Sequence, residues 1–454
     1  MPSLSTYEES LRGLLTESLE RHGVPGAVVG IARGDERCVV AVGSANRSTG
    51  VDVTPDTLFQ IGSVTKIYTA TLVMQLVHAG LVDLDSPVRG ALQEFRVADD
   101  AATLTITPRQ LLSHTSGIEG DHFLDCGRNP DALWRYVSTL EDVGQLHAPD
   151  DQFSYCNTGY GVLGRLVEEA TGDHYTRALQ RRLLKPLSAT RTVTLAEQAI
   201  VHRVAAGHVA IDGEHRVQPW TLSRFNLASG GIIASADDVL DIAQVHGRGG
   251  KNTEGAQVVS SRAVADMAEA QAEVPGGGDW GLGWSVRRWD DADVLAHDGD
   301  TVGQRAFLRL LPEENTAIVV LTNSQLGARV AADVFDDAGP SVLGATLPAL
   351  PAPIPVADRD DPTGYSGIYE RLHQRLAIAG GDDDTLRMTV IPDDLFALAG
   401  RREHTLTLEP VGDGRFVTED PTSGVPAMVA FAAGEDDDET DYVYFGLRGH
   451  RRIA

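Results

Sequence analysis

The hydrophobic pattern first predicts an amphipathic helix near the amino terminus. Its apolar residues recur at the three- and four-residue spacing of one helix face: Tyr7, Leu11, Leu14, Leu15 and Leu19. Two apolar runs follow at residues 27–32 and 38–42, separated by a turn-like Arg-Gly-Asp segment. This arrangement is typical of a β-hairpin. The chain therefore opens with a helix and two antiparallel strands.

The middle of the chain has the pattern of helices. A long apolar segment predicts a helix over residues 63–78, which Gly80 ends. Thr107 supplies a capping hydroxyl in front of a proline, so a short helix begins there. A further helix is expected over 157–169. We expect these helices to form a helical subdomain.

Apolar runs return later in the chain, at residues 294–296, 306–311 and 317–321, and predict three strands. A helix is expected to follow them at 326–337. Strands at both ends of this region with helices between them indicate one sheet assembled from distant segments. The fold class is therefore α/β, in the broad α+β sense, with a sheet flanked by helices.

A proline-rich stretch suggests a boundary between two domains. Prolines crowd into one short segment at positions 348, 351, 353 and 355, and acidic residues follow. Beyond it, short alternating runs separated by turns predict a small antiparallel β-barrel or β-sandwich, with strands at 365–369, 385–390, 404–408, 427–431 and 442–445. We expect a catalytic domain over 1–345, a linker over 346–363 and a small all-β domain over 364–454.

Composition narrows the possible partners and the location. The 454 residues carry a net charge of −27, which repels nucleic acid and anionic membranes, so we expect neither as a partner. No apolar stretch approaches the roughly 18–20 residues that span a bilayer. The amino terminus lacks the pattern of an export signal, which favours a cytoplasmic location. The three cysteines have no metal-like spacing, and we expect no metal or other cofactor.

Ser63-Val64-Thr65-Lys66 forms an S-x-x-K motif at the start of the predicted long helix. Residues three apart share a helix face, so the lysine amine can reach the serine oxygen. A serine hydroxyl needs such a base to become a nucleophile, and lysine serves as one when its pKa is lowered. The motif alone is weak evidence, because short motifs also arise by chance.

Tyr155-Cys156-Asn157 is a second candidate, placed just before a predicted helix. A phenol beside a lysine can shuttle protons, and Asn157 could then hold Lys66 and a substrate amide. The alternative interpretation makes Tyr155 a core residue and Asn157 a helix cap. Cys156 is expected to be a small buried residue rather than a nucleophile.

His297-Asp298-Gly299 is the third candidate, at the exit of a predicted strand. A glycine there lets a substrate approach the strand edge closely. The backbone N–H that follows it, on Asp300, could form half of an oxyanion hole. His-x-Gly by itself is uninformative in a chain rich in both residues, so the weight comes from its position between strands.

These three motifs, in this order, resemble the catalytic motifs of class C β-lactamases and penicillin-binding-protein-like serine hydrolases. The surrounding segments are also similar to that family: "TLFQIGSVTKIYTATLVMQLVHAGLVDLDSPV" (57–88), "ITPRQLLSHTSGI" (106–118), "FSYCNTGYGVLGRLVEEATG" (153–172), "NLASGGIIASADDV" (226–239) and "HDGDTVGQRAFLRLLPEENTAIVVLTNS" (297–324). The segment "GYSGIYE" (364–370) resembles the start of the lipocalin-like domain that some members carry. The resemblance implies a β-lactamase/transpeptidase-like fold with an antiparallel sheet.

The resemblance also assigns roles to the residues. Ser63 is the nucleophile that forms an acyl-enzyme, and Lys66 and Tyr155 share the general-base and general-acid duties. Asn157 positions Lys66 and the acyl amide, and His297 assists Tyr155 and binds substrate. The backbone N–H groups of Ser63 and Asp300 form the oxyanion hole. Which of Lys66 and Tyr155 is the base stays open.

The chain departs from true class C β-lactamases, which carry Lys-Thr-Gly where this sequence has His-Asp-Gly. Loss of that cation weakens recognition of a β-lactam carboxylate. His-x-Gly versions resemble esterases, D-aminopeptidases and penicillin-binding-protein-type thioesterases and transacylases. We therefore expect a serine acyl-enzyme hydrolase or acyltransferase acting on an ester, thioester or amide, including transacylation or peptide cyclisation in a natural-product pathway. A β-lactamase is less favoured.

The acyl donor would be a small molecule or a peptide, and the acceptor an amine or water. Segments 119–130 and 272–284 are candidate specificity loops, and Trp280 and Trp284 of the second segment could contact substrate. Gly299 of the His-Asp-Gly motif could also contact substrate. Packing is the alternative role of the two tryptophans. A simple esterase or D-amino-acid peptidase is the second candidate function. A catalytically silent ligand-binding protein is an alternative of another class.

Overall fold

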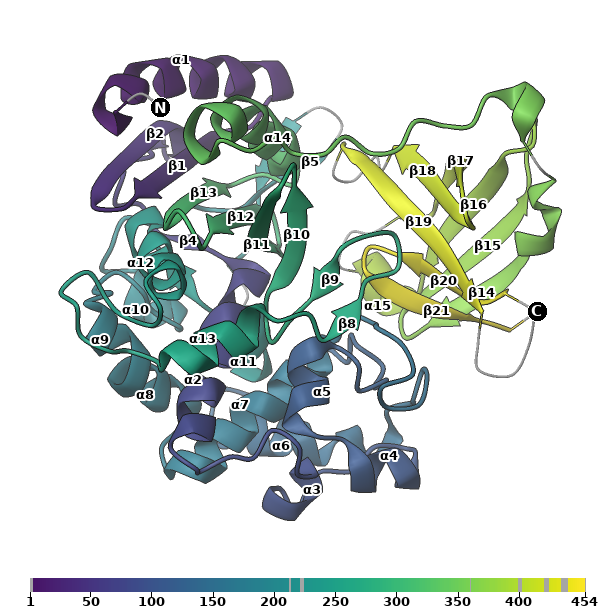
Figure 1. The fold of residues 1–454 in the computed structure, drawn as a ribbon, viewed down its shortest axis with the longest axis horizontal. Helices are drawn as coiled ribbons and strands as arrows, with labels where there is room; N and C mark the ends of the chain where they lie inside the picture. Colours follow the sequence, from purple (N-terminus) through teal and green to yellow (C-terminus); the bar gives the residue numbers. More distant parts are fainter. Residues whose placement is uncertain are drawn as a thin grey trace.

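The structure is a computed structural model that describes residues 3–211, 214–220, 224–359, 361–398, 402–419, 424–433 and 440–453. Within these residues an antiparallel sheet lies between helices, and a closed all-β barrel follows it along the chain. In Figure 1 the barrel lies to the right of the sheet, and most of the helices lie below the sheet. The expected fold class, an antiparallel sheet with helices and a separate β domain, is confirmed.

The main sheet has nine strands in the order β3-β2-β1-β13-β12-β11-β10-β9-β8. Their bounds are β1 Gly26–Arg33, β2 Glu36–Asn46, β3 Val51–Asp52, β8 Ala272–Glu273, β9 Asp279–Trp280, β10 Ser285–Trp289, β11 Ala292–Thr301, β12 Gln304–Leu311 and β13 Thr316–Thr322. The early hairpin meets the late strands where β1 pairs with β13, with Ala27 opposite Thr322. Segments far apart in sequence therefore form adjacent strands, as the pattern predicted.

Helices cover both faces of this sheet. On one face α1 (Leu4–His22) and α14 (Gly327–Ala338) share an apolar cluster with the strands. On the other face lie α12 (Ala236–Gly247) and the buried α2 (Thr65–His78), with α7 (Asn157–Thr171) and α11 (Leu227–Gly230) beyond α2. The remaining helices are α3 Val88–Ala91, α4 Asp100–Thr105, α5 Pro108–Ser113, α6 Ala132–Ser138, α8 Tyr175–Leu179, α9 Lys185–Leu187, α10 Ala196–Ala199, α13 Ser261–Ala268 and α15 Asp394–Leu398.

The carboxy-terminal strands close into a barrel of eight: β14 Gly367–Arg371, β15 Gln374–Gly380, β16 Leu386–Pro392, β17 His404–Gly412, β18 Arg415–Glu419, β19 Pro426–Ala433, β20 Thr440–Phe445 and β21 Arg448–Arg452. Pairing of Tyr369 with Arg452 completes the circle. The alternating pattern missed β15, β18 and β21. β21 reads Arg-Gly-His-Arg-Arg and has no apolar alternation; its Arg448 contacts the catalytic part, and its His450 binds Gln374 of the barrel. The expected domain boundaries stay a prediction.

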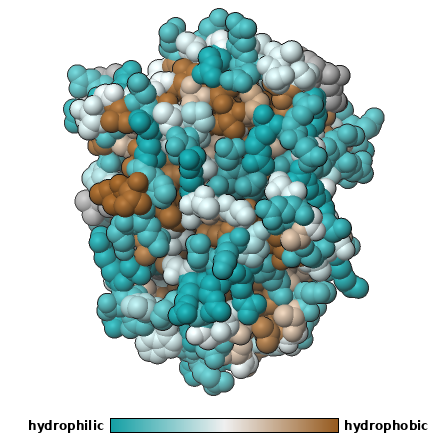
Figure 2. Space-filling view, turned by 90° about the vertical axis from the view of Figure 1, so that its left-hand side faces the viewer, coloured by the Kyte–Doolittle hydropathy of each residue, from teal (hydrophilic) through white to brown (hydrophobic). Residues whose placement is uncertain are grey.

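Two short two-stranded sheets complete the fold: β4 (Phe59–Gln60) with β7 (Ile233–Ala234), and β5 (His208–Ile211) with β6 (Glu214–Val217). Figure 2 shows the face opposite the barrel, where apolar side chains are separated by hydrophilic ones. Among the described residues, no helix combines the length and the apolar character needed to cross a membrane.

Three local expectations differ from the structure. The long helix begins at Thr65, and Ser63 lies in a 3₁₀ turn, Gly62–Val64, in front of it. Cys156 rather than Asn157 caps α7, and its sulfur accepts a hydrogen bond from the Gly159 backbone at 3.2 Å. Strand β11 continues through the His-Asp-Gly motif to Thr301. The expected cap at Thr107 is confirmed as a complete capping box.

Leu11→Ala tests the packing of α1 on the sheet. Leu11 is fully buried in the cluster that α1 and α14 share, so truncation leaves a cavity. We expect the free energy of unfolding to fall by about 2–5 kcal/mol, measured by urea denaturation. The control Glu9→Ala, at an exposed position of the same helix, should change it little. Equal stability of Leu11→Ala and the parent would contradict this packing.

Candidate active site

Ser63 lies in a turn that packs against the edge of β11. β10 begins at Ser285, opposite Ala296, so the edge of β11 beyond Ala296 is left for this turn. The approach is so close that a Cβ on Gly299 would stand 1.9 Å from the Ile61 carbonyl and 2.9 Å from the Ser63 nitrogen. Gly62 has a φ of +51°, and a Cβ there would lie 2.7 Å from the Asp300 nitrogen. The two expected oxyanion-hole residues therefore lie on adjacent segments.

Lys66 lies one helical turn after Ser63 and is fully buried. Its Nζ donates hydrogen bonds to Asn157 Oδ1 at 2.7 Å and to the Ser229 carbonyl at 2.7 Å, and it lies 3.3 Å from Ser63 Oγ. A neutral amine that donates to the two carbonyl oxygens keeps its lone pair for the Ser63 hydroxyl. Burial lowers the pKa of Lys66 well below its ordinary value, and the positive charge of Arg448 lowers it further. The amine is therefore suited to accept a proton from Ser63.

Tyr155 lies over the same lysine, with Lys66 Nζ 4.8 Å from the centre of its ring. The ring is buried, and its hydroxyl has no partner of good hydrogen-bond geometry among the described residues. Burial raises the pKa of Tyr155, although the neighbouring Ser63 hydroxyl and the Arg448 guanidinium oppose this. The phenol thus stays protonated at neutral pH and can donate a proton.

His297 lies on β11 with its ring centre 6.3 Å from that of Tyr155. Its Nδ1 is 2.8 Å from the Asp298 carbonyl, which can only accept, so Nδ1 carries the proton. Burial lowers the pKa of His297 to about 3, and the imidazole is neutral at pH 7. Its other nitrogen, Nε2, is buried without a hydrogen-bond partner among the described residues and is left as an acceptor.

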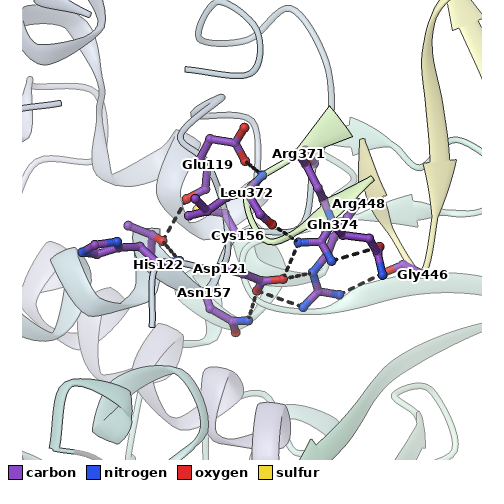
Figure 3. A network of polar contacts seen from close by, with 12 residues as sticks. Glu119, Asp121, His122, Cys156, Asn157, Arg371, Leu372, Gln374, Gly446 and Arg448 are labelled. Atoms are coloured by element: carbon purple, nitrogen blue, oxygen red, sulfur yellow. Dashed lines mark hydrogen bonds and ion pairs between the residues drawn. The ribbon is translucent and has the colours of Figure 1, made fainter. Parts of the chain in front are cut away.

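Asn157, at the start of α7, joins Lys66 to a carboxylate that the sequence pattern did not single out. Its Oδ1 faces Lys66, and its Nδ2 donates to Asp121 at 2.8 Å. Two arginines of the barrel, Arg371 and Arg448, pair with the same carboxylate (Figure 3). Asp121 lies inside the loop segment 119–130 expected to act in specificity, but neither arginine belongs to a recognisable motif.

The two tryptophans lie in packed positions. Trp280 is buried among Phe153, Tyr155 and Val274, and its ring lies edge-on to His297. Trp284 is fully buried in the main core, and its indole nitrogen donates to His246 at 3.3 Å. The structure thus uses both rings in packing, and contact of either with substrate stays a prediction.

Cys156 and His114 are structural. Burial raises the pKa of the Cys156 thiol to about 12, which leaves it protonated and unreactive. His114 is buried behind Tyr155 and accepts a hydrogen bond from the Cys156 backbone. In the described part of the chain, no group of three or more His, Cys, Asp or Glu side chains is arranged to hold a metal ion.

The arrangement therefore brings together a serine hydroxyl, a buried amine, a protonated phenol and a close-packed strand edge. These are the parts needed for attack on a carbonyl carbon by an activated serine. The sequence matches the family described as Beta-lactamase over residues 11–338. The chain belongs to the beta-lactamase family of serine hydrolases.

Similarity to known proteins extends over most of the chain. Penicillin-binding protein 4 of Amycolatopsis lactamdurans is 38% identical over 379 residues, which are 80% of this chain and 97% of that protein. The crystal structure of SurE superposes with a TM-score of 0.81 at 28% identity, covering 99% of this chain and 100% of SurE. D-Amino acid amidase from Ochrobactrum anthropi SV3 shares the fold, with a TM-score of 0.61 at 21% identity over 72% of this chain and 98% of the amidase.

Gly299→Ala tests the close approach of β11 to the Ser63 turn in this beta-lactamase-family chain. The added Cβ would overlap the Ile61 carbonyl, so the turn must shift. We expect the rate of Ser63 acylation to fall about 100-fold, because a shift of about 1 Å misplaces the nucleophile. Stopped-flow assay with an activated ester measures this rate. Gly13→Ala, where a Cβ meets open space, is the control; unchanged acylation in Gly299→Ala would contradict the geometry.

Proposed function

We propose that the protein is a serine acyltransferase that forms an acyl-enzyme on Ser63 from an ester, thioester or amide. The observation that carries the proposal is the contact between Ser63 Oγ and the buried amine of Lys66 at 3.3 Å. A buried lysine with a lowered pKa, held between two oxygen acceptors, can act as the general base that takes the serine proton.

In the first half-reaction Ser63 Oγ bonds to the acyl carbon, and its proton passes to Lys66 Nζ. The Tyr155 hydroxyl gives a proton to the leaving group and takes one from Lys66, so the leaving alcohol, thiol or amine departs neutral. In the second half an amine or water attacks the acyl carbon and the Ser63 bond breaks. The proton of the attacking group passes to Tyr155, a proton passes from Tyr155 to Lys66, and Lys66 returns one to Ser63 Oγ, which leaves as a free hydroxyl. Backbone N–H groups of Ser63 and Asp300 stabilise the tetrahedral oxyanion.

The surroundings of Ser63 support transfer to an amine over simple hydrolysis. Leu447, at the tip of the β20–β21 hairpin of the barrel, packs with Tyr155 and Trp280, and its carbonyl accepts from the Tyr155 backbone at 2.9 Å. The barrel thus forms a wall of the site, which limits access of water and can shape an acceptor site. Hydrolysis, by a simple esterase or a D-amino-acid peptidase, is the second candidate and uses the same residues.

We further propose that the acyl donor is an amino-acid or peptide derivative, as in peptide transacylation or cyclisation in a natural-product pathway. SurE, whose similarity extends over both the sheet and the barrel, has a crystal structure with D-Leu. A β-lactam is a poorer fit: His297, neutral at pH 7, stands where true class C enzymes carry a lysine cation for the substrate carboxylate.

Intact-protein mass spectrometry after mixing with a fluorophosphonate or an activated ester tests the nucleophile. We expect one adduct per chain in the parent and in Ser48→Ala, an exposed control, and none in Ser63→Ala. Added D- or L-amino acid esters should then shorten the lifetime of the acyl-enzyme and appear in the product. An acyl-enzyme that decays at the same rate with and without amine would make the protein a hydrolase. Absence of an adduct with every donor would contradict the enzyme proposal and favour a ligand-binding protein.

The pH dependence of acylation tests Lys66 as the base. Protonated Lys66 cannot accept the serine proton, so the rate rises as pH increases through the pKa of Lys66. Because that pKa lies well below the ordinary 10.5, the half-maximal rate should fall well below pH 10.5. Lys66→Met should lower the rate about 10²–10⁴-fold, while the control Lys185→Arg should match the parent. A half-maximal rate at pH 10.5 would contradict this role.

A further inference from the structure

The carboxylate of Asp121 joins the barrel to the catalytic residues. Asp121 is 2% exposed and accepts four hydrogen bonds. Asn157 Nδ2 donates at 2.8 Å and Arg371 Nη1 at 2.9 Å, while Arg448 donates through Nε at 2.7 Å and Nη2 at 3.2 Å. Figure 3 shows Asp121 between Asn157 on one side and the two guanidinium groups on the other.

The negative charge on Asp121 determines the orientation of the Asn157 side-chain amide. Burial alone would raise the pKa of Asp121, but the guanidinium groups of Arg448 and Arg371 outweigh it and hold the pKa below its ordinary value. An ionised carboxylate accepts hydrogen bonds and cannot donate one. Asn157 must therefore present its NH₂ group to Asp121, which leaves its oxygen facing Lys66 at 2.7 Å.

We infer that Asp121 is a positioning residue for catalysis: clamped by Arg371 and Arg448 of the barrel, it fixes the orientation of Asn157 and through it the place of Lys66. The barrel is then part of the catalytic apparatus and not only a neighbour of it. This inference rests on the proposed function, since it gives Lys66 the role of base.

The competing explanation is that Asp121 only holds the barrel against the catalytic part. Other contacts do that without touching Asn157. Arg329 of α14 donates to the Gly424 carbonyl at 2.9 Å, for example. If Asp121 only joins the two parts, its loss should resemble the loss of Arg329. If it orients Asn157, its effect should depend on whether Asn157 is present.

The first experiment measures the acylation rate of Ser63 by an activated ester in Asp121→Asn, Asn157→Ala and the double variant. We expect Asp121→Asn to lower the saturating rate about 10- to 100-fold with little change in KM, because a misplaced base slows chemistry more than binding. In the Asn157→Ala background the same substitution should lower the rate less than about 2-fold. Losses that multiply in the double variant would overturn the inference.

Two further variants separate positioning from folding. Asp121→Asn leaves two guanidinium groups without their anion, which can destabilise the fold. Asp121→Asn/Arg371→Gln removes one charge of each sign and should fold while still losing the acylation rate. Arg329→Gln is the matched control for a lost contact to the barrel and should acylate like the parent. A folded charge-conserving variant with the parent's rate would overturn the inference.

A second measurement does not depend on turnover. The chain has seven asparagines, so selective ¹⁵N labelling gives few side-chain amide signals, and Asn157→Ala identifies the pair from Asn157. We expect this pair to exchange slowly with solvent in the parent and in Arg329→Gln, and rapidly in folded Asp121→Ala. Unchanged exchange in Asp121→Ala would overturn the inference. Absence of any Ser63 adduct in the parent would instead contradict the proposed function. The amide exchange of Asn157 could still be interpreted in that case, because it does not depend on acylation.

Discussion

The buried amine of Lys66 is the constraint on which the rest of the site depends. Removing an amine from water costs free energy unless polar partners replace the water. Here three separate elements supply them: the Ser63 turn, the start of α7 and the Ser229 carbonyl of α11. Because the three must converge on one atom, the packing of α2 against α7 and α11 sets the position of Lys66 and, in the proposed mechanism, the reactivity of Ser63.

The same constraint reaches beyond the catalytic part. Asn157 can hold Lys66 only if its own amide is held, and the groups that do this carry full charges taken from two domains. Buried ion pairs are weak contributors to stability but costly to disrupt, and their geometry is specific. That combination suits a role in fixing an orientation. The similarity to SurE runs over the sheet and the barrel together, in keeping with two parts that work as one unit.

Much of this architecture could be predicted from the sequence, because apolar periodicity and short motifs are local signals. The helix at the amino terminus, the first hairpin, the Thr107 cap and the three late strands were all predicted correctly. The motifs also supplied Ser63, Lys66, Tyr155, Asn157 and His297, which the structure brings to one place.

What the sequence could not provide depends on distance along the chain. Asp121 and Arg448 are 327 positions apart, and nothing near either one indicates the other. Strand β21 has a polar sequence, in which Arg448 pairs with Asp121 of the catalytic part while His450 and Arg452 bind within the barrel region, so the apolar pattern passed over it. Cys156 as a cap was also missed, because sulfur is not among the preferred capping groups.

The pairing of β1 with β13 has a consequence for how the molecule acquires its reactivity. Ala27 and Thr322, which lie opposite each other, are separated by 295 positions, so their pairing requires the closure of a very long loop. Contacts of such separation form late and slowly in folding. The Ser63 turn also depends on a distant contact, because it packs against Gly299 of β11, far along the chain. A chain in which these distant contacts have not formed lacks the surroundings of Ser63 that the proposed reaction requires, so we expect covalent labelling of Ser63 to report only folded molecules.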